Sequence, residues 1–261
     1  WSNDEGDVEV YVDNAILHGA STPNHLKKFG WICESRAVAW QLSEQLKENH
    51  EEVLKNYQYI FTCDEDLLSL HPKFVFGFAG STLPWVKLME YNVYKKTRLC
   101  SMIASHKQMC PGHMIRHQVA QKMMETGRVD VMGGAAGSPK FGQELRGQIH
   151  PDKLSGLSPY MFSIAMENCQ YDTYFTEKLT DCFATGTVPV YWGCPSIGDY
   201  FNTDGIIMLT NDFDISTLTA DRYYGMMPAI EDNFKRVSKM KSPEDYLWTE
   251  YMEKHYNLKA I

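Results

Sequence analysis

The chain has 261 residues, of which 44% are hydrophobic, so it carries enough apolar side chains to build a core and is not an intrinsically disordered sequence. Its formal net charge of −8 at pH 7 argues against nucleic acid as the main partner, although a local basic pocket for phosphate stays possible. No apolar run reaches the roughly 18 to 20 residues that cross a bilayer, so we expect no transmembrane segment. Whether a membrane anchor precedes Trp1 stays an open question.

The first part of the chain alternates between the periodicities of strands and helices. A helix is expected at residues 35–49, where Ala39, Leu42 and Leu46 fall on one face. Strands are expected at residues 8–12, 28–33, 57–63 and 74–78. Strands that alternate with helices favour a parallel sheet over a sandwich.

The second part continues the alternation. Strands are expected at residues 98–104, 129–132, 161–166, 188–193 and 205–209, and helices at residues 112–126, 176–185, 230–238 and 243–255. We therefore predict an α/β protein of two Rossmann-like halves that face a cleft, with a short first domain at 1–90, a second at 91–240 and a C-terminal helix at 241–261 that packs back on the body. The glycine-rich run at 133–137 is more typical of a turn than of a phosphate cradle.

Two patterns resemble metal sites but have simpler readings. Asp64 and Asp66 form an acid-x-acid triplet that could hold a divalent ion, yet either one suits the cap of a helix that begins before Leu67. His113 and His117 have the i, i+4 spacing of a zinc pair, but the glutamate of His-Glu-x-x-His is absent. We favour a helix cap for the first pattern and a helix face near a phosphate site for the second.

The most informative stretch is residues 160–201. An apolar strand ends at Glu167-Asn168, a polar loop follows, and Thr176-Glu177-Lys178 opens a helix that Gly186 stops. In open α/β sheets ligands bind outside the carboxyl ends of the strands, which is where this loop would lie. A helix N-terminus with a lysine in its first turn suits the diphosphate of a nucleotide.

This stretch resembles the GDP-fucose-dependent fucosyltransferases of the α-1,3/1,4 type, glycosyltransferase family 10. The family pattern is a strand ending in Glu-Asn, a short loop, Tyr-x-Thr-Glu-Lys, a helix, and Val-Pro-Val/Ile-x-x-Gly. The counterparts here are Glu167-Asn168, residues 174–178 and residues 188–193, with no insertion. Shorter similarities lie at residues 27–35 and 98–116. The resemblance implies a GT-B-like glycosyltransferase fold.

The resemblance also implies roles for single residues. Glu34 matches the acceptor-side glutamate and is the candidate catalytic base, although the family's following proline is replaced by Arg36. Arg116 and Lys178 are candidate ligands of the diphosphate, and Glu177 would accept hydrogen bonds from the ribose hydroxyls. The alternative for each is an ordinary strand end or a solvated helix residue.

The remaining candidates in the donor motif are Asn168, Tyr174, Thr176 and Glu167. Tyr174 would contact the diphosphate or the sugar through its hydroxyl, and Asn168 would lie on the rim of the pocket. Glu167 would meet the sugar or orient the loop, and a purely structural hydrogen-bonding role is equally open.

The implied activity is inverting transfer of L-fucose from GDP-fucose to a hydroxyl of a glycan, with no metal cofactor because side chains and a helix end carry the phosphate charge. The alternatives are the same fold with GDP-mannose or a UDP-sugar as donor, and a sugar-nucleotide-binding module without catalysis. Seven cysteines, an odd number, favour a reducing compartment, so we expect a cytoplasmic protein of the bacterial or viral type.

Overall fold

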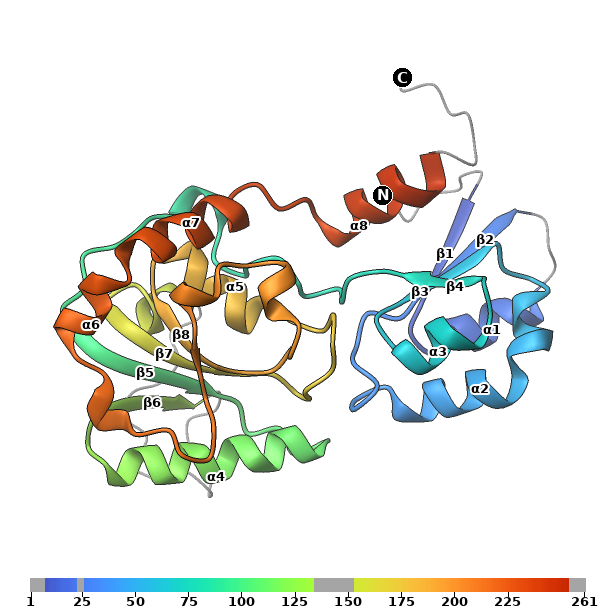
Figure 1. Ribbon diagram of the computed structural model, residues 1–261. Helices are drawn as coiled ribbons and strands as arrows, with labels where there is room; N and C mark the ends of the chain where they lie inside the picture. The colour runs from blue at the N-terminus through green and yellow to red at the C-terminus, as the bar shows by residue number, and fades with distance from the viewer. Residues whose placement is uncertain (1–7, 23–25, 134–152, 254–261) are drawn as a thin grey trace. The chain divides into compact units, whose positions relative to one another are not determined.

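The computed structural model describes residues 8–22, 26–133 and 153–253. The chain divides into two compact units, of which one comprises Trp1–Gly80 with Lys241–Ile261 and the other comprises Ser81–Met240. Each unit has a parallel sheet covered by helices (Figure 1), which confirms the predicted α/β class. No helix among the described residues is long and apolar enough to span a membrane.

The sheet of the first unit has four parallel strands in the order β1-β2-β3-β4. Its strands are β1 (Val8–Val12), β2 (Lys27–Trp31), β3 (Tyr59–Thr62) and β4 (Phe74–Phe76). The connecting helices are α1 (Ala15–Ser21), α2 (Trp40–Leu54) and α3 (Glu65–Leu70), and α8 (Pro243–Leu247) with a π-helical turn (Trp248–Met252) follows from the end of the chain. Strand order follows chain order, so each crossover leads to the adjacent strand.

The two faces of this sheet bury separate clusters, because alternate side chains of a strand point to opposite faces. Ile60 and Ile32 pack with α1, α2 and α3 through residues such as Leu46. Phe29 and Phe61 stack on the other face, against Leu247 and Met252 of the C-terminal segment. Residues 243–252 therefore complete the core of the first unit.

The sheet of the second unit is also parallel, in the order β6-β5-β7-β8-β9. Its strands are β5 (Arg98–Ala104), β6 (Val129–Gly133), β7 (Tyr160–Met166), β8 (Val188–Trp192) and β9 (Ile207–Met208). Pro189 lies inside β8, where its missing N–H would normally disrupt a ladder. Among the described residues, the short β9 pairs with Val190 and Tyr191 alone, so no described strand lies beside Pro189 on that side.

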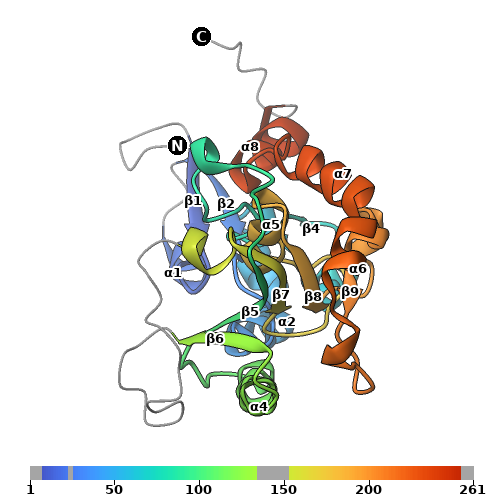
Figure 2. The same cartoon turned by 90° about the vertical axis from the view of Figure 1, so that its left-hand side faces the viewer.

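Helices cover both faces of the second sheet (Figures 1 and 2). Helix α4 (Pro111–Glu125) packs on β5 and β6, and α5 (Glu177–Ala184) packs on the opposite face with α7 (Met227–Val237); α6 (Ala220–Gly225) precedes α7. Proline in the first turn suits the start of α4, where the lost N–H has no helical partner. Gly186 ends α5 with φ +65°, in the left-handed region that glycine adopts without penalty.

The predicted elements exist, with shifts at their ends. The largest shift is in α2, which begins at Trp40 rather than at residue 35 and continues to Leu54. Residues 35–39 form a turn instead, in which the Ser35 carbonyl accepts the N–H groups of Val38 and Ala39. The strand predicted at 205–209 is shorter, at Ile207–Met208. The described part of the predicted helix at 243–255 is Pro243–Leu247 followed by a π-helical turn.

Residues 81–90, predicted with the first half, are bonded to α5 of the second unit. The Ser81 carbonyl accepts the N–H of Glu177 at 2.6 Å, and Asp181 Oδ1 accepts the N–H groups of Trp85 and Val86 at 2.7 and 2.9 Å. The chain thus enters the second unit directly at the N-terminus of α5.

Residues 134–137 of the predicted glycine-rich turn and residues 254–255 of the predicted last helix lie outside the described residues.

Candidate active site

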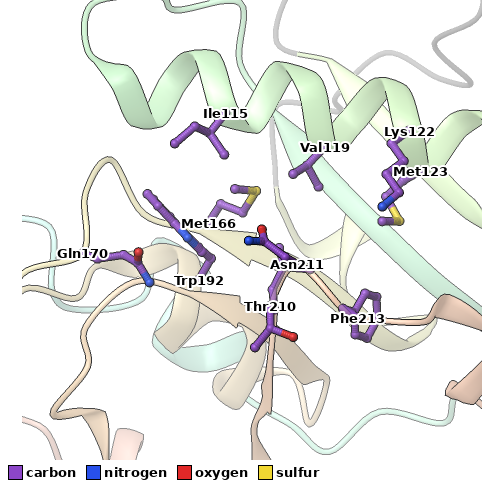
Figure 3. Close-up of a pocket in the computed structure, with 11 residues that line it drawn as sticks. Ile115, Val119, Lys122, Met123, Met166, Gln170, Trp192, Thr210, Asn211 and Phe213 are labelled. Atoms are coloured by element: carbon purple, nitrogen blue, oxygen red, sulfur yellow. The ribbon is translucent and has the colours of Figure 1, made fainter.

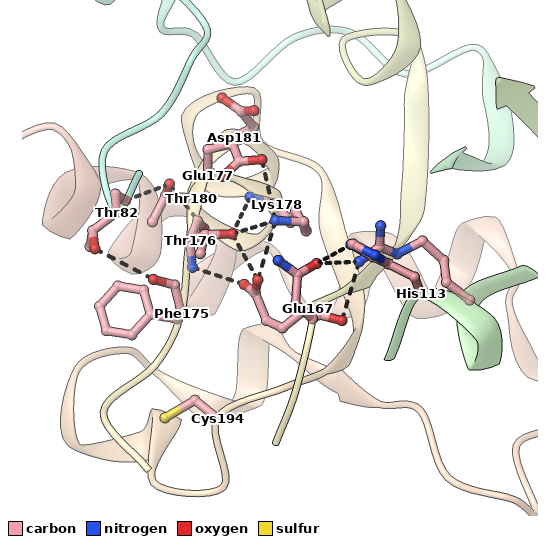
Figure 4. Close-up of polar contacts among 12 residues, drawn as sticks. Thr82, His113, Glu167, Phe175, Thr176, Glu177, Lys178, Thr180, Asp181 and Cys194 are labelled. Carbon is pink, nitrogen blue, oxygen red and sulfur yellow. Dashed lines mark hydrogen bonds and ion pairs between the residues drawn. The ribbon is translucent and has the colours of Figure 1, made fainter. Parts of the chain in front are cut away.

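The order of strands in the second unit identifies where a ligand would bind. The chain leaves β5 toward β6 through α4, and it leaves β7 toward β8 through α5, so adjacent β5 and β7 send their connections in opposite directions. Such a switch point leaves a crevice at the carboxyl ends of the two strands. The N-terminal half of α4, the loop after β7 and the N-terminus of α5 meet at this edge (Figure 4).

Glu167, at the end of β7, is an internal anchor of the loop that follows. It is 0% exposed, and its two oxygens accept the backbone N–H of Thr176 at 2.8 Å and the Thr176 hydroxyl at 2.7 Å. Burial raises the pKa of Glu167, while the nearby Lys178 ammonium opposes that change. With both oxygens engaged, Glu167 closes the loop of residues 168–175 into a fixed shape.

Lys178 lies in the first turn of α5 between two carboxylates. Its Nζ is 3.5 Å from Glu167 Oε2 and 3.4 Å from Glu177 Oε1, and it donates to Thr176 Oγ1 at 2.9 Å. Thr176 is the N-cap of the helix. Burial would lower the pKa of Lys178, but Glu167 and Glu177 outweigh it and hold the pKa above its ordinary value. The side chain stays charged and keeps 23% of its surface exposed.

Arg116 reaches the same loop from α4. Its Nη2 donates to Asn168 Oδ1 at 2.8 Å and to the Glu167 carbonyl at 3.3 Å, and its Nε is buried without an acceptor among the described residues. His113, one turn earlier, joins its Nε2 to the same Asn168 oxygen at 3.0 Å. Its Nδ1 accepts the N–H of Met109 at 3.0 Å, which assigns the proton to Nε2. Arg116 and Asn168 are thus brought together, as the two sequence-predicted ligands on this side.

Glu177 is nearly buried and has a second cationic partner that the sequence did not point to. Lys153 Nζ lies 3.2 Å from Glu177 Oε1 and 3.0 Å from Asp181 Oδ2. Burial would raise the pKa of Glu177, but Lys178 and Lys153 outweigh burial and hold the pKa below its ordinary value. The only sequence signal for this cluster is the i, i+4 spacing of Glu177 and Asp181 on α5.

Tyr174 is buried, with 2% of its surface exposed, and so is less open to a ligand than the sequence interpretation required. The residue before it, Thr173, has φ +63°, a conformation that is uncommon for a residue other than glycine. Strained backbone of this kind recurs where a loop is held in one functional shape. Here it turns the chain between the exposed Asp172 and the buried Tyr174.

Glu34 belongs to the first unit. It is exposed in a bend just after β2, and Asp13 at the end of β1 holds this bend, since Asp13 Oδ1 accepts the Cys33 N–H at 2.9 Å. Asp64 caps α3 by accepting the N–H of Asp66, and Arg36 pairs with both of these aspartates. The helix-cap reading of this acidic triplet is therefore confirmed.

Arg116, Glu167, Asn168, Glu177 and Lys178 together form the polar centre of the second unit. An open pocket of about 380 Å³ adjoins this polar centre (Figure 3). Trp192, Met166 and Ile115 line its apolar part, and Gln170 and Asn211 lie on its polar side. Met166 directly precedes Glu167, and Ile115 directly precedes Arg116. The pocket thus contains none of the ion-paired side chains but shares their supporting elements.

Comparison with known proteins relates this part of the chain to one family. The model for glycosyltransferase family 10 (fucosyltransferase) C-term matches residues 93–219, which contain the switch point and the donor motif. An α-(1,3)-fucosyltransferase of Helicobacter pylori is 34% identical over 77 residues, 30% of this chain and 15% of that protein. The α-(1,3)-fucosyltransferase B of Drosophila melanogaster is 38% identical over 63 residues, 24% of this chain and 14% of that protein.

Two further similarities concern a protein-modifying relative and the fold. The GDP-fucose protein O-fucosyltransferase 3 of Bos taurus is 35% identical over 85 residues, 28% of this chain and 18% of that protein. The chain therefore spans well under two thirds of the curated relatives it matches. The crystal structure of TarM aligns with a TM-score of 0.57 and 11% identity over 93% of this chain and 53% of that chain, which supports the GT-B-like fold class. Residues 93–219, which hold this polar centre, therefore match glycosyltransferase family 10, the fucosyltransferases.

Proposed function

We propose that the protein is an inverting fucosyltransferase that uses GDP-fucose as donor and a hydroxyl of a glycan as acceptor. One observation carries the proposal: Arg116, Lys178 and Glu177 converge on one loop at the switch point of the family-matched unit. Two cations and a helix N-terminus suit a diphosphate, and an ionised carboxylate suits a pair of ribose hydroxyls.

In this reaction the acceptor oxygen attacks the anomeric carbon of fucose while the bond from that carbon to the phosphate oxygen breaks. GDP leaves with the bonding electrons, and a base takes the acceptor proton. Lys178 and Arg116 would stabilise the charge that develops on the diphosphate. We assign the base to Glu34, which is exposed at the end of β2 and therefore open to an acceptor. Since these cations would carry the phosphate charge, we expect no metal requirement.

A second acceptor class has specific support. The relatives named GDP-fucose protein O-fucosyltransferase 3 are matched about as well as the α-(1,3)-fucosyltransferases, at 35% identity over 85 residues for the bovine protein. A protein hydroxyl is therefore the second candidate acceptor. In this proposal the residues of the polar centre contact the phosphates and the ribose of the donor. They do not by themselves select its base or its sugar. GDP-mannose or a UDP-sugar is therefore the alternative donor.

The test is a transfer assay on the purified chain. Each of GDP-fucose, GDP-mannose and a UDP-sugar is incubated with a panel of oligosaccharides and of serine- and threonine-containing peptides, with and without EDTA. The proposal predicts product only from GDP-fucose, at a rate that EDTA leaves unchanged, and mass spectrometry of the product identifies the acceptor class. Binding of GDP-fucose without turnover on any acceptor would favour the non-catalytic binding module.

We propose a reducing, cytoplasmic location on the basis of the cysteines. None of the seven forms a disulfide among the described residues, and six of them are buried. Burial raises the pKa of Cys100 and Cys182, which keeps these thiols protonated and unreactive. Titration of thiols in the denatured protein purified without reductant should return seven.

A further inference from the structure

Lys153 joins the polar cluster of α5, formed by Glu177, Lys178 and Asp181, from a different part of the chain. It opens a short 3-10 helix (Lys153–Gly156) before β7. Its Nζ contacts Glu177 Oε1 at 3.2 Å and Asp181 Oδ2 at 3.0 Å, and it lies 4.2 Å from the centre of the Trp85 ring. Three partners on two further segments therefore fix this ammonium group.

The ammonium of Lys153 offsets the repulsion between two neighbouring carboxylates on α5. Glu177 and Asp181 are one helical turn apart and almost fully buried, with 6% and 1% of their side-chain surface exposed. Two carboxylates at this spacing repel each other, and a buried carboxylate without a cation is costly. Asp181 is further fixed by the N–H groups of Trp85 and Val86. Lys153 bridges the pair and offsets the charge of both carboxylates, while burial still holds the pKa of Asp181 above its ordinary value.

Lys153 also affects Lys178, which contacts both Glu167 and Glu177 when no ligand is bound. A bound diphosphate would draw Lys178 toward its own oxygens. Without Lys153, that move would take away both ion-pair partners that the described residues give Glu177, and a buried carboxylate without such a partner is costly. With Lys153 present, Glu177 keeps a partner.

We propose that Lys153 is a positioning residue for nucleotide-sugar binding: it holds the Glu177 carboxylate ionised and in place, and so leaves Lys178 free to bind the diphosphate. This inference rests on the proposed function. Lys153 would touch neither the sugar nor the phosphate, and its effect would pass through Glu177.

The pH dependence follows from the charges around Glu177. These are Lys178 and Asp181 on α5, Lys153 on the 3-10 helix, Glu167 after β7 and Arg116 on α4. Lys178 and Lys153 hold the pKa of Glu177 below its ordinary value against the effect of burial. Loss of Lys153 removes one of these cations, so the pKa of Glu177 rises and donor binding is lost at a higher pH as the solution is acidified.

The experiment compares Lys153→Ala, Lys153→Gln and Lys153→Arg in the full chain, with Lys95→Ala, an exposed lysine, as the matched control. Calorimetry gives the Kd of GDP between pH 5 and 8, and the transfer assay gives KM for GDP-fucose and kcat. We expect the Ala and Gln variants to weaken GDP binding and raise KM about tenfold or more with kcat changed less, and the Arg variant to restore binding. The acid limb of the binding curve should move to higher pH in Lys153→Gln.

The Gln variant removes the charge but keeps a polar side chain, one bond shorter than lysine, that can still donate hydrogen bonds, so it covers the case in which Lys153→Ala does not fold. The inference is overturned if folded Lys153→Gln binds GDP as tightly as the wild type, or if Lys153→Arg is as weak as Lys153→Ala. A wild-type protein that binds no GDP would instead overturn the proposed function. The two failures are therefore distinguishable.

Discussion

Lys178 is the side chain with the most direct role in the proposed donor site, because it is charged, partly exposed and already placed between two carboxylates. A charged hydrogen bond of this kind contributes about 1.5–3 kcal/mol, so Lys178→Ala should weaken GDP binding roughly 10- to 100-fold. Calorimetric titration measures the change, with Lys95→Ala as the charge-matched control. Equal Kd values for the two variants would remove Lys178 from the site.

Glu34 makes a different prediction, because a base acts on the chemical step and not on the donor. We expect Glu34→Gln to lower kcat by about 100-fold or more while GDP binding stays unchanged. Glu48→Gln, an exposed glutamate of α2 in the same unit, should leave both quantities as they are. Full turnover in Glu34→Gln would assign the base elsewhere, and Asp13, whose carboxylate holds the adjacent bend, would be tested next.

His113 predicts a pH dependence of stability. Burial and the neighbouring Arg116 lower the pKa of His113 to about 4, below the unfolded value near 6.5. Between these pKa values the unfolded chain binds more protons at His113 than the folded chain does. The contribution of neutral His113 to the free energy of unfolding is therefore fully present above pH 6.5 and is lost as the pH falls toward 4. Urea unfolding at pH 7 and 4.5 should show a loss on the order of 2 kcal/mol that is smaller in His113→Asn. An identical loss in the variant would assign the effect to other groups.

Among the elements, α4 and the loop after β7 make the closest contact in the site. A Cβ on Gly112, in the first turn of α4, would lie 2.0 Å from the carbonyl oxygen of Asn168. Gly112→Ala should therefore push the helix and the loop apart at a cost of about 1–3 kcal/mol and displace Arg116 from Asn168. Chemical denaturation and GDP binding test this, and Gly225→Ala, where a Cβ meets nothing within 4 Å, is the control. Unchanged stability and binding in Gly112→Ala would show that the contact is not tight.

The strands and helices were predictable because their hydrophobic periodicity is strong, whereas their ends depend on local hydrogen bonds. The predicted strand at 98–104 agrees with Arg98–Ala104 because both faces of β5 are covered. Helix α2 starts late because the Ser35 carbonyl is used in a turn, a choice that periodicity does not reveal. Helix α1 was not predicted, since its seven residues are too few for a periodic pattern.

The site was predictable only where its residues are close in sequence. Residues 167–178 form one continuous motif, so Glu167, Thr176 and Lys178 could be expected together. Lys153 and Asp181 join the cluster through tertiary contacts, and Lys153 follows no motif. The buried position of Tyr174 also depends on packing, because an aromatic side chain in a loop motif is as suited to a core as to a ligand.

At the scale of the whole molecule, the described donor residues all belong to the second unit, while Glu34 belongs to the first. GDP should therefore slow amide hydrogen exchange in α4, in the loop of residues 167–176 and at the start of α5, because a ligand suppresses local opening where it binds. Peptides from β1 to β4 should exchange at their original rates. Hydrogen-exchange mass spectrometry tests this, and protection confined to the first unit would place the nucleotide elsewhere.

We expect the second unit to bind a guanine nucleotide sugar without a metal. The most direct measurement is the thermal stability of the purified chain with GDP, GDP-fucose, GDP-mannose or UDP, each with and without EDTA. At about 100 times Kd a ligand adds roughly 2.7 kcal/mol, which should raise Tm by about 5 °C. We predict such a rise with GDP and GDP-fucose that EDTA does not reduce. No rise with either guanine nucleotide, or a rise with UDP alone, would contradict it.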